Sequence, residues 1–165
     1  MTPKRLKPKA GEEKARVPVK AETRLNAMTG KLREHRYRLT PQRLAIVKIL
    51  AVSEEHPTVE NIYERVKRDF PYTSLATIYK TVNLLKNVGE VMELGFVDDS
   101  NRYDGIRPFP HAHLICTKCR KIIDPNVTAL RELPKELTEK TGYRILNHRL
   151  DFFGICPRCQ RGGGA

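Results

Sequence analysis

Four cysteines form two C-x-x-C pairs, Cys116 with Cys119 and Cys156 with Cys159. A turn of this spacing places two sulfurs on one edge of a tetrahedron, and four thiolates suit Zn²⁺. In a reducing compartment two such pairs indicate a metal site before disulfides or free thiols, which are the alternatives. Because the protein would fill all four positions, we expect a structural zinc that ties the end of the chain to the start of the same domain.

A second set of possible ligands surrounds the pair His111 and His113. Alternate residues of a strand face the same side, so both imidazoles can reach one ion. The pair alone is weak evidence, since two exposed strand histidines would look the same. Asp104 and Asp124, which end predicted strands before and after the pair, strengthen the interpretation. Imidazoles combined with carboxylates suit Fe²⁺, Mn²⁺ or Zn²⁺ better than copper.

The other three histidines give no clear signal. His35 lies in a basic stretch and is expected to be solvated. His148 shares a predicted strand face with hydrophobic residues, which favours an interior histidine over a ligand. His56 precedes Pro57 at a loop-to-helix junction, and its local sequence assigns it no role.

A third set of polar residues could contact nucleic acid. The predicted helix from residue 74 to 83 carries hydroxyl, amide and ammonium groups on its polar side, which can reach phosphates and base edges in a major groove. An ordinary amphipathic surface helix, with a partly buried tyrosine, is the alternative. Together with the basic stretch that precedes it, the candidate DNA contacts are Arg38, Thr40, Gln42, Arg43, Ser74, Thr77, Tyr79 and Lys80.

The charge of the chain agrees with a polyanionic partner. The net charge is +12 and the pI is about 9.8. The excess is spread along the chain, and its densest part lies between residues 31 and 48, where a merely solvated surface is the alternative. No stretch approaches the ~20 apolar residues that cross a bilayer. The charged N-terminus lacks the apolar segment of a secretory signal. We therefore expect a cytoplasmic protein that does not enter a membrane.

The first half of the chain is predicted to be helical from about residue 23 to 89. Thr40 and Ser74 are expected helix N-caps, a third helix starts at Pro57-Thr58, and Gly89 closes the last one. Alternating apolar residues from 91 to 96, a polar turn and a return strand at residues 102–104 follow. Three helices and a hairpin predict a winged helix-turn-helix.

The second half is predicted to be a small α/β domain, which makes the whole chain α+β. We expect short strands at residues 111–116 and 121–124, a helix at 128–141 that Pro134 kinks or delays, and a long strand at 143–153. With few apolar residues, this unit needs both a metal and a second subunit. The expected divisions are a disordered basic arm (1–22), the winged-helix DNA-binding domain (23–106), a hinge (107–110), the dimerisation and metal-binding domain (111–160) and a flexible tail (161–165).

Six motifs occur in an order that closely resembles the ferric uptake regulator family over residues ~23 to 160. They are Thr40-Pro41-Gln42-Arg43, His56-Pro57-Thr58, Ala76-Thr77-Ile78-Tyr79, Arg102-Tyr103-Asp104, His111-x-His113-x-x-Cys116-x-x-Cys119 and Asn147-His148-Arg149-Leu150. The resemblance implies a homodimeric repressor whose metal-dependent binding to an AT-rich inverted-repeat operator uses two winged helices.

The resemblance also gives His56 a role. It implies that His56, Asp104, His111, His113 and Asp124 hold a regulatory Fe²⁺ or Mn²⁺. A metal held from both sides of the hinge would fix the angle between the domains, and with it the spacing of the two recognition helices.

The acidic ligands indicate which branch of the family the chain resembles. In the iron-responsive branch the positions of Asp104 and Asp124 are typically glutamates, whereas the peroxide-responsive PerR branch has three histidines and two aspartates. In that branch Fe²⁺ reacts with hydrogen peroxide and a ligand histidine, here His56 or His111, becomes 2-oxo-histidine. Iron, zinc or manganese sensing without a peroxide response is the alternative.

Two departures limit what the resemblance implies. Many iron regulators have a further metal site near the dimer core, but here Pro110, Ala112 and Arg131 occupy its positions and only His148 is left. On the predicted recognition helix, Lys80 stands where arginine or asparagine is expected, so operator specificity does not carry over.

Two other classes of protein explain less of the sequence. A zinc-ribbon module of an RNA or enzyme complex would account for the cysteines and the charge, but not for the helix-turn-helix. A metallo-hydrolase using His111, His113 and an aspartate needs an open metal position and a spare general base. No such base is placed nearby, so we expect a regulator and not an enzyme.

Overall fold

The computed structural model describes residues 21–96 and 100–162. The predicted basic arm lies outside the described residues up to residue 20, as do most of the hairpin turn and the last three residues of the predicted tail. Helix α1 (Ala21–Glu34) includes the last two residues of the expected arm, residues 21 and 22, so the predicted disorder is wrong there.

Four helices form the N-terminal unit: α1, α2 (Pro41–Val52), α3 (Val59–Asp69) and α4 (Leu75–Asn87). Side-chain oxygens of Thr40, Thr58 and Ser74 each accept a hydrogen bond from the backbone N–H three residues further on, at 3.1–3.2 Å. These bonds satisfy donors that a helix leaves unpaired at its N-terminus, which explains why the helices begin there. The caps predicted at Thr40 and Ser74 are confirmed. Gly89, with φ of 73°, closes α4 as predicted.

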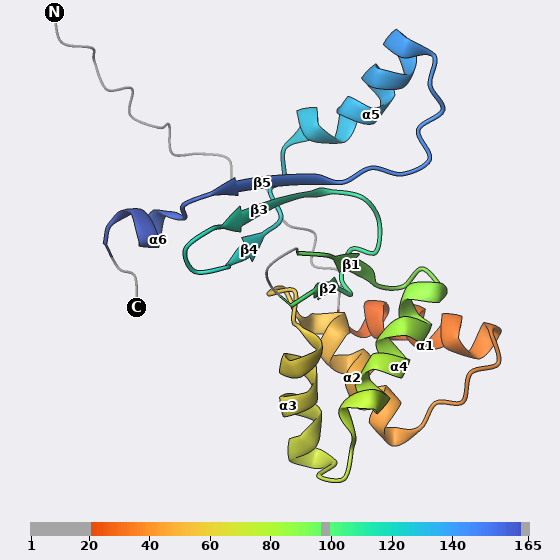
Figure 1. Ribbon diagram of the computed structural model, residues 1–165. Coiled ribbons are helices and arrows are strands. Elements are labelled where there is room, and N and C mark those ends of the chain that lie inside the picture. The colour runs from red at the N-terminus through yellow and green to blue at the C-terminus, as the bar shows by residue number, and fades with distance from the viewer. Residues whose placement is uncertain (1–20, 97–99, 163–165) are drawn as a thin grey trace, which may run out of the picture.

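The core of this unit is made of aliphatic side chains from all four helices. Met28 and Leu32 of α1 are fully buried, together with Leu50 of α2, Ile62 of α3 and Leu85 of α4. Strands β1 (Met92–Leu94) and β2 (Arg102–Asp104) follow as the predicted antiparallel hairpin. In Figure 1 this hairpin lies between the helices and the second sheet.

The C-terminal unit contains strands β3 (Ala112–Cys116), β4 (Ile122–Ile123) and β5 (Leu150–Gly154), with helices α5 (Thr128–Thr141) and α6 (Pro157–Gln160). The sheet order is β4-β3-β5, and β3 runs antiparallel to β4 and parallel to β5. Figure 1 shows α5 on the far side of this sheet from the N-terminal helices, and none of its residues is buried. A small apolar cluster of Leu94, Ile115 and Ile122 joins the hairpin to the sheet.

The long strand predicted for residues 143–153 is wrong over its first seven residues. Strand β5 begins only at Leu150, which pairs with Ala112 at the start of β3. Before Ala112 the chain contains Pro108 and Pro110, and proline offers no N–H to a neighbouring strand. The segment before Leu150 therefore has no strand to pair with. His148 accordingly lies outside any strand and is partly exposed, so its prediction as an interior histidine is also wrong.

The predicted helix at residues 128–141 is confirmed with Pro134 inside it, whereas the short helix α6 was not predicted. Among the described residues, no helix combines the length and the apolar character that crossing a bilayer requires.

One strained residue ends α1. Arg36 has φ of 59°, a left-handed conformation that costs a side-chain-bearing residue about 1–2 kcal/mol. The backbone N–H of Tyr37 donates to the carbonyl of Leu32 at 2.8 Å, which closes the helix as in a glycine-terminated helix.

We predict that Arg36→Gly raises the free energy of unfolding by about 0.5–1 kcal/mol, because glycine adopts this conformation without steric cost. Arg36→Ala, which removes the same charge but keeps the Cβ, is the control and should not stabilise. Urea unfolding of both variants measures the difference, and equal gains would contradict the strain argument.

Candidate metal centres

The four cysteines converge at one end of the C-terminal sheet. Cys116 ends β3, and Cys156 follows β5, which pairs with β3 in parallel, so the two C-x-x-C turns start at the same edge. One sulfur from each of the four lies within 4.8 Å of the others, and the Sγ atoms of Cys119 and Cys156 are 3.7 Å apart. None forms a disulfide. The donor set and its spacing fit a tetrahedral Zn²⁺.

The surroundings of these thiols favour negative charge. Backbone N–H groups, first that of Cys119, lower the pKa of Cys116 to about 6. The pKa of Cys159 is raised to about 12, first by its hydrogen bond with Cys156 and then by burial. Without a cation the Cys159 sulfur thus keeps its proton, which it shares in a hydrogen bond with the neighbouring thiolate. A bound divalent metal would displace that proton.

A second cluster forms where the two units meet. His56, His111, His113 and Asp124 each bring one ligand atom within 4.8 Å of the others. The Oδ2 atom of Asp104 lies 3.5 Å from Nε2 of His56 and 3.3 Å from Nε2 of His111. All five residues of the predicted regulatory set therefore come together at one place.

The residues of this second cluster come from distant parts of the chain. His56 precedes α3, Asp104 ends β2, His111 and His113 flank the first residue of β3, and Asp124 follows β4. The backbone N–H of Tyr103 donates to the carbonyl of Pro57 at 3.0 Å, which holds the His56 loop beside β2.

Backbone groups orient two of the five side chains. The Oδ1 atom of Asp104 accepts hydrogen bonds from the N–H groups of Ile106 and Arg107, at 2.7 and 2.9 Å. The Nδ1–H of His111 donates to the carbonyl of Phe109 at 2.8 Å. These bonds leave Oδ2 of Asp104 and Nε2 of His111 directed at the cluster, as outer partners of metal ligands do.

Buried atoms without partners provide the test of fit for a metal. Within the described residues, a ligand atom of every member is buried and accepts or donates no hydrogen bond: Nε2 of His56, Oδ2 of Asp104, Nε2 of His111, Nε2 of His113 and Oδ1 of Asp124. Burying such atoms without partners is costly, and a cation bound between them would remove the cost. The residues present fit a divalent metal with nitrogen and oxygen ligands.

The charges of the cluster lead to the same conclusion. Burial alone would lower the pKa of His56, but its contacts with Asp104 and Asp124 outweigh burial and raise it to about 9. Burial and then the neighbouring His111 lower the pKa of His113 to about 4. A protonated His56 thus balances the carboxylates in the metal-free protein, and metal binding would displace its proton.

The backbone at His56 is strained. Its φ is 51°, in the left-handed region, and the side chain is 2 % exposed. Such a conformation costs a non-glycine residue about 1–3 kcal/mol and is found where function constrains the chain. Nothing in the local sequence signalled this conformation.

Sequence reasoning missed three residues around the cluster. Asp151 pairs across the sheet with His113, and its Oδ1 lies 3.4 Å from Nδ1 of that histidine. Its carboxylate within an otherwise apolar strand was the available signal. Arg107 lies 3.8 Å from Asp124. Arg24 of α1, which is buried, donates from Nε to the carbonyl of Gly105 at 2.5 Å, directly after Asp104.

The predicted DNA contacts lie near the starts of two helices. In α2, the Thr40 hydroxyl is occupied in the cap and Arg43 donates to the carbonyl of Arg38, while Gln42 is partly buried. These contacts fix the Arg43 side chain against the loop before the helix.

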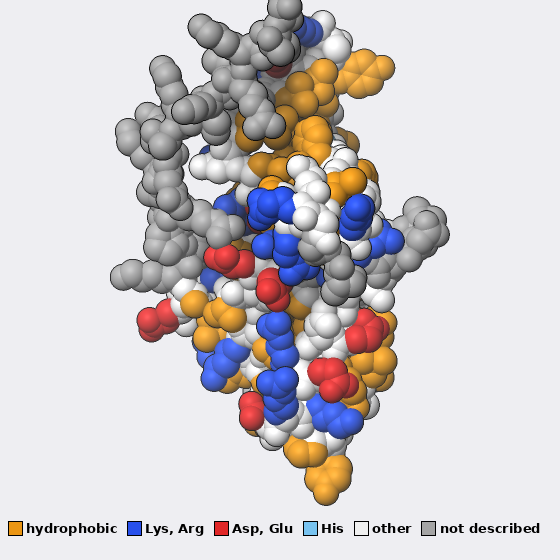
Figure 2. Space-filling model, turned by 90° about the vertical axis from the view of Figure 1, so that its left-hand side faces the viewer, with side chains coloured by type: hydrophobic (Ala, Val, Ile, Leu, Met, Phe, Trp, Pro, Cys, Tyr) orange, Lys and Arg blue, Asp and Glu red, His pale blue; other side chains and the backbone are white. Residues whose placement is uncertain are grey.

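On α4 the Ser74 hydroxyl serves as the cap and also bonds the hydroxyl of Thr77 at 3.0 Å. Tyr79 is 43 % exposed, with its hydroxyl 3.4 Å from Glu60, and Lys80 is exposed. The tyrosine is therefore not a core residue. On the face shown in Figure 2, basic side chains alternate with acidic and hydrophobic ones over the lower, helical part, so this face carries no unbroken basic surface.

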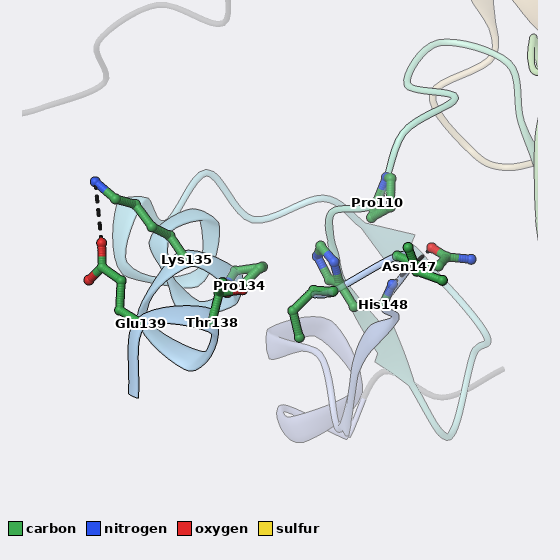
Figure 3. A pocket seen from close by; sticks show the side chains of 9 residues that line it. Pro110, Pro134, Lys135, Thr138, Glu139, Asn147 and His148 are labelled. Atoms are coloured by element: carbon green, nitrogen blue, oxygen red, sulfur yellow. Dashed lines mark hydrogen bonds and ion pairs between the residues drawn. The ribbon is translucent and has the colours of Figure 1, made fainter. Parts of the chain in front are cut away.

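An open groove of about 480 Å³ lies between α5 and the segment before β5. Figure 3 shows Pro134 and Thr138 of α5 across from Pro110 and His148. His148 is the one imidazole among the lining residues, and Lys135 is paired with Glu139. We assign no metal to this groove.

The chain is similar to known proteins over most of its length. The profile of the ferric uptake regulator family matches residues 34–153. The peroxide-responsive repressor PerR of Staphylococcus aureus is 37% identical over 139 residues, which cover 84% of this chain and 93% of that protein.

Two solved structures are also similar. The Campylobacter jejuni peroxide stress regulator has a TM-score of 0.65 at 33% identity, covering 79% of this chain and 98% of its own. The Helicobacter pylori ferric uptake regulator Fur has a TM-score of 0.72 at 24% identity, covering 85% and 93%, and supports the fold alone. The predicted α+β fold class, with a helical unit and hairpin before a small α/β unit with four cysteines, is confirmed.

Gly105, next to Asp104, allows us to test the packing that positions this ligand. A Cβ added there would lie 2.6 Å from the carbonyl oxygen and 2.8 Å from the Cβ of Leu50. We predict that Gly105→Ala destabilises the protein by about 1–3 kcal/mol, because backbone of α2 cannot move aside. Gly154→Ala, where the added Cβ would meet nothing within 4 Å, is the control. Thermal unfolding compares them, and matching stabilities would refute the close approach.

Proposed function

Because the chain belongs to the ferric uptake regulator family, we propose that this metal-responsive regulator is a homodimeric repressor that senses hydrogen peroxide. It binds an AT-rich inverted-repeat operator when metal is bound and releases it after oxidation. The observation that carries the proposal is the buried cluster of three imidazoles and two carboxylates whose ligand atoms have no hydrogen-bond partner.

The regulatory ligands are His56 and Asp104 from the N-terminal unit, with His111, His113 and Asp124 from the C-terminal unit. Residues 105–110 connect the two units, so a shared ion restricts their relative rotation. Metal binding favours the orientation of the two units in which all five ligand atoms converge. DNA binds the orientation that places α4 correctly against the operator, so the metal and DNA affinities are coupled.

Peroxide sensing is supported by the two aspartates and by the 37% identity to the staphylococcal peroxide repressor. Bound Fe²⁺ would supply the activation of hydrogen peroxide. In the net reaction, one peroxide oxygen is added to the carbon between the two nitrogens of a ligand imidazole, and the other leaves as water. The imidazole loses two electrons, and the peroxide gains them.

The target histidines are His111 and His56. Both follow from the resemblance to the peroxide-responsive branch. The His111 side chain is 10 % exposed, whereas those of His56 and His113 are 2 % and 1 % exposed, so peroxide reaches His111 most readily. An oxidised imidazole is a weaker ligand, and loss of the metal frees the hinge.

Dimerisation is supported by apolar residues exposed on the C-terminal unit. Leu146 is 82 % exposed, Tyr143 74 % and Phe153 61 %, and no residue of helix α5 is buried. A second copy would cover such a surface, since soluble monomers rarely expose contiguous apolar patches. Two protomers related by a two-fold axis present two copies of α4 to an inverted repeat. The cysteine cluster would hold a structural Zn²⁺ that keeps this unit folded.

Iron, zinc or manganese sensing without a peroxide response is the second candidate, because the same nitrogen and oxygen ligands suit those ions.

The test of peroxide sensing uses full-length protein and a DNA duplex selected by the Mn²⁺-loaded protein from a randomised library. We expect dilute peroxide to release this duplex from the Fe²⁺-loaded protein and not from the Mn²⁺-loaded protein, measured by fluorescence anisotropy. Mass spectrometry should find a gain of about 16 Da, one oxygen atom, on a peptide containing His111 or His56.

His113→Ala is the control for this test and should fold but bind DNA independently of the metal. Metal-dependent DNA binding that peroxide leaves unchanged would support the second candidate. DNA binding that does not depend on metal at all would contradict both candidate functions.

Cys116→Ser tests the structural zinc. Since the small C-terminal unit has few buried residues, loss of one thiolate should release the zinc and disrupt the dimer. Elemental analysis reads the zinc content and size-exclusion chromatography with light scattering reads the mass. A variant that stays dimeric without zinc would contradict the role of the cysteines.

A further inference from the structure

Arg149, immediately before β5, contacts both units of the protein. Its Nη2 donates to the carbonyl of Gly95 at 2.9 Å, and its guanidinium lies 5.9 Å from the ring centre of Phe96. Both residues directly follow β1 in the hairpin. Its Nε donates to Oδ2 of Asp151, two residues further along the chain, in β5. One side chain therefore bridges parts of the chain that are 54 residues apart.

The other oxygen of Asp151 faces the regulatory cluster. Its Oδ1 is 3.4 Å from Nδ1 of His113, and the parallel pairing of β3 with β5 sets this register. The two side chains are 10 % and 1 % exposed, so solvent screens their interaction little. A ligand histidine normally binds metal through one ring nitrogen and donates from the other to a carboxylate or carbonyl. Asp151 is placed to receive that bond from His113.

Glu93 extends the connection from the hairpin to α4. Its carboxylate accepts hydrogen bonds from Asn101 at 2.7 Å and from the hydroxyl of Tyr103 at 3.1 Å, and it pairs with Lys86 in the last turn of α4. Glu93 lies on β1 and Tyr103 opposite it on β2, so one carboxylate joins both strands to the helix. A displacement of the hairpin therefore acts on α4.

We propose that Arg149 and Asp151 are positioning residues that couple the regulatory cluster to the hairpin, and through Glu93 to α4. This inference rests on the proposed function, since it explains how metal binding reaches the DNA-binding helix. Residues 105–110 and the small apolar cluster of Leu94, Ile115 and Ile122 already join the units. The contact of Arg149 with the hairpin adds a polar attachment, and Asp151 connects that attachment to the metal ligand His113.

The effect of Arg149 on stability and its effect on coupling differ in size, which distinguishes a coupling role from a purely structural one. Arg149 is 43 % exposed, and an exposed ion pair adds only about 0–1 kcal/mol to stability. Coupling between two sites, by contrast, typically changes affinity by about 5- to 150-fold. Loss of Arg149 should therefore weaken the coupling strongly while changing the melting temperature little.

The experiment compares full-length wild type with Arg149→Gln, Asp151→Asn and the double variant. Arg144→Gln, which removes the same charge from an exposed position in the same segment, is the matched control. For each protein we measure the DNA dissociation constant with and without Mn²⁺, and the Mn²⁺ affinity by calorimetry. Hydrogen exchange of residues 92–94 and 102–104 is followed in parallel with and without Mn²⁺.

We expect Mn²⁺ to tighten DNA binding by wild type and Arg144→Gln, and the ratio of the two dissociation constants to fall about 5- to 10-fold in Arg149→Gln. Asp151→Asn and the double variant should lose no more than Arg149→Gln, because the two residues act in series. Mn²⁺ should slow exchange in the wild-type hairpin and not in the variants.

An unchanged ratio, additive losses, or exchange that is accelerated equally with and without Mn²⁺ would overturn the inference. A wild-type protein that does not bind DNA in response to Mn²⁺ would defeat the proposed function instead. The exchange measurement would then still decide whether Arg149 links the cluster to the hairpin.

Discussion

Five side chains from both halves of the chain meet at a buried point where three imidazoles and two carboxylates have ligand atoms without hydrogen-bond partners. In the metal-free protein this arrangement depends on a proton at His56, whose pKa is about 9 between Asp104 and Asp124. A divalent cation would balance the two carboxylates with a larger positive charge than the proton, and it would contact all five ligand side chains. In the proposed function, the relative position of the two units depends on what occupies this point.

The apolar contact between the units is too small to fix their positions alone. Its buried residues are Leu94 of the hairpin with Ile115 and Ile122 of the sheet, and the partly buried Met92 and Phe96 pack against them. The N-terminal unit, by contrast, has a core drawn from four helices. A unit with a large core joined through a small apolar cluster to one with a smaller core suits the proposed mechanism, in which a change in one buried ion alters the angle between the units without unfolding either. The cysteine cluster belongs to the weaker unit, where the apolar core is smallest.

Groups hydrogen-bonded to the ligand residues, or packed beside them, fix the orientation of the ligand side chains as well as their positions. Backbone groups hold Asp104 and His111 from the hinge side, Arg24 holds Gly105 from α1, and Asp151 faces His113 from β5. Each support comes from a different element. A shift of any of these elements therefore moves the ligand side chains, and a change in the positions of the ligand side chains acts back on the elements. Reciprocity of this kind is what linkage between two sites requires.

The sequence alone determined the local features. Caps at Thr40 and Ser74, the hairpin and the paired cysteines depend on residues near one another in the chain, so spacing was sufficient to predict them. The role proposed for His56 followed only from the family resemblance, because its neighbours in sequence carry no ligand signal. Only the tertiary structure brought His56 beside Asp104, began β5 at Leu150 and placed Arg149 against the hairpin. These features depend on which strands pair and on which segments pack together, and such contacts between distant residues leave no periodic pattern in the chain.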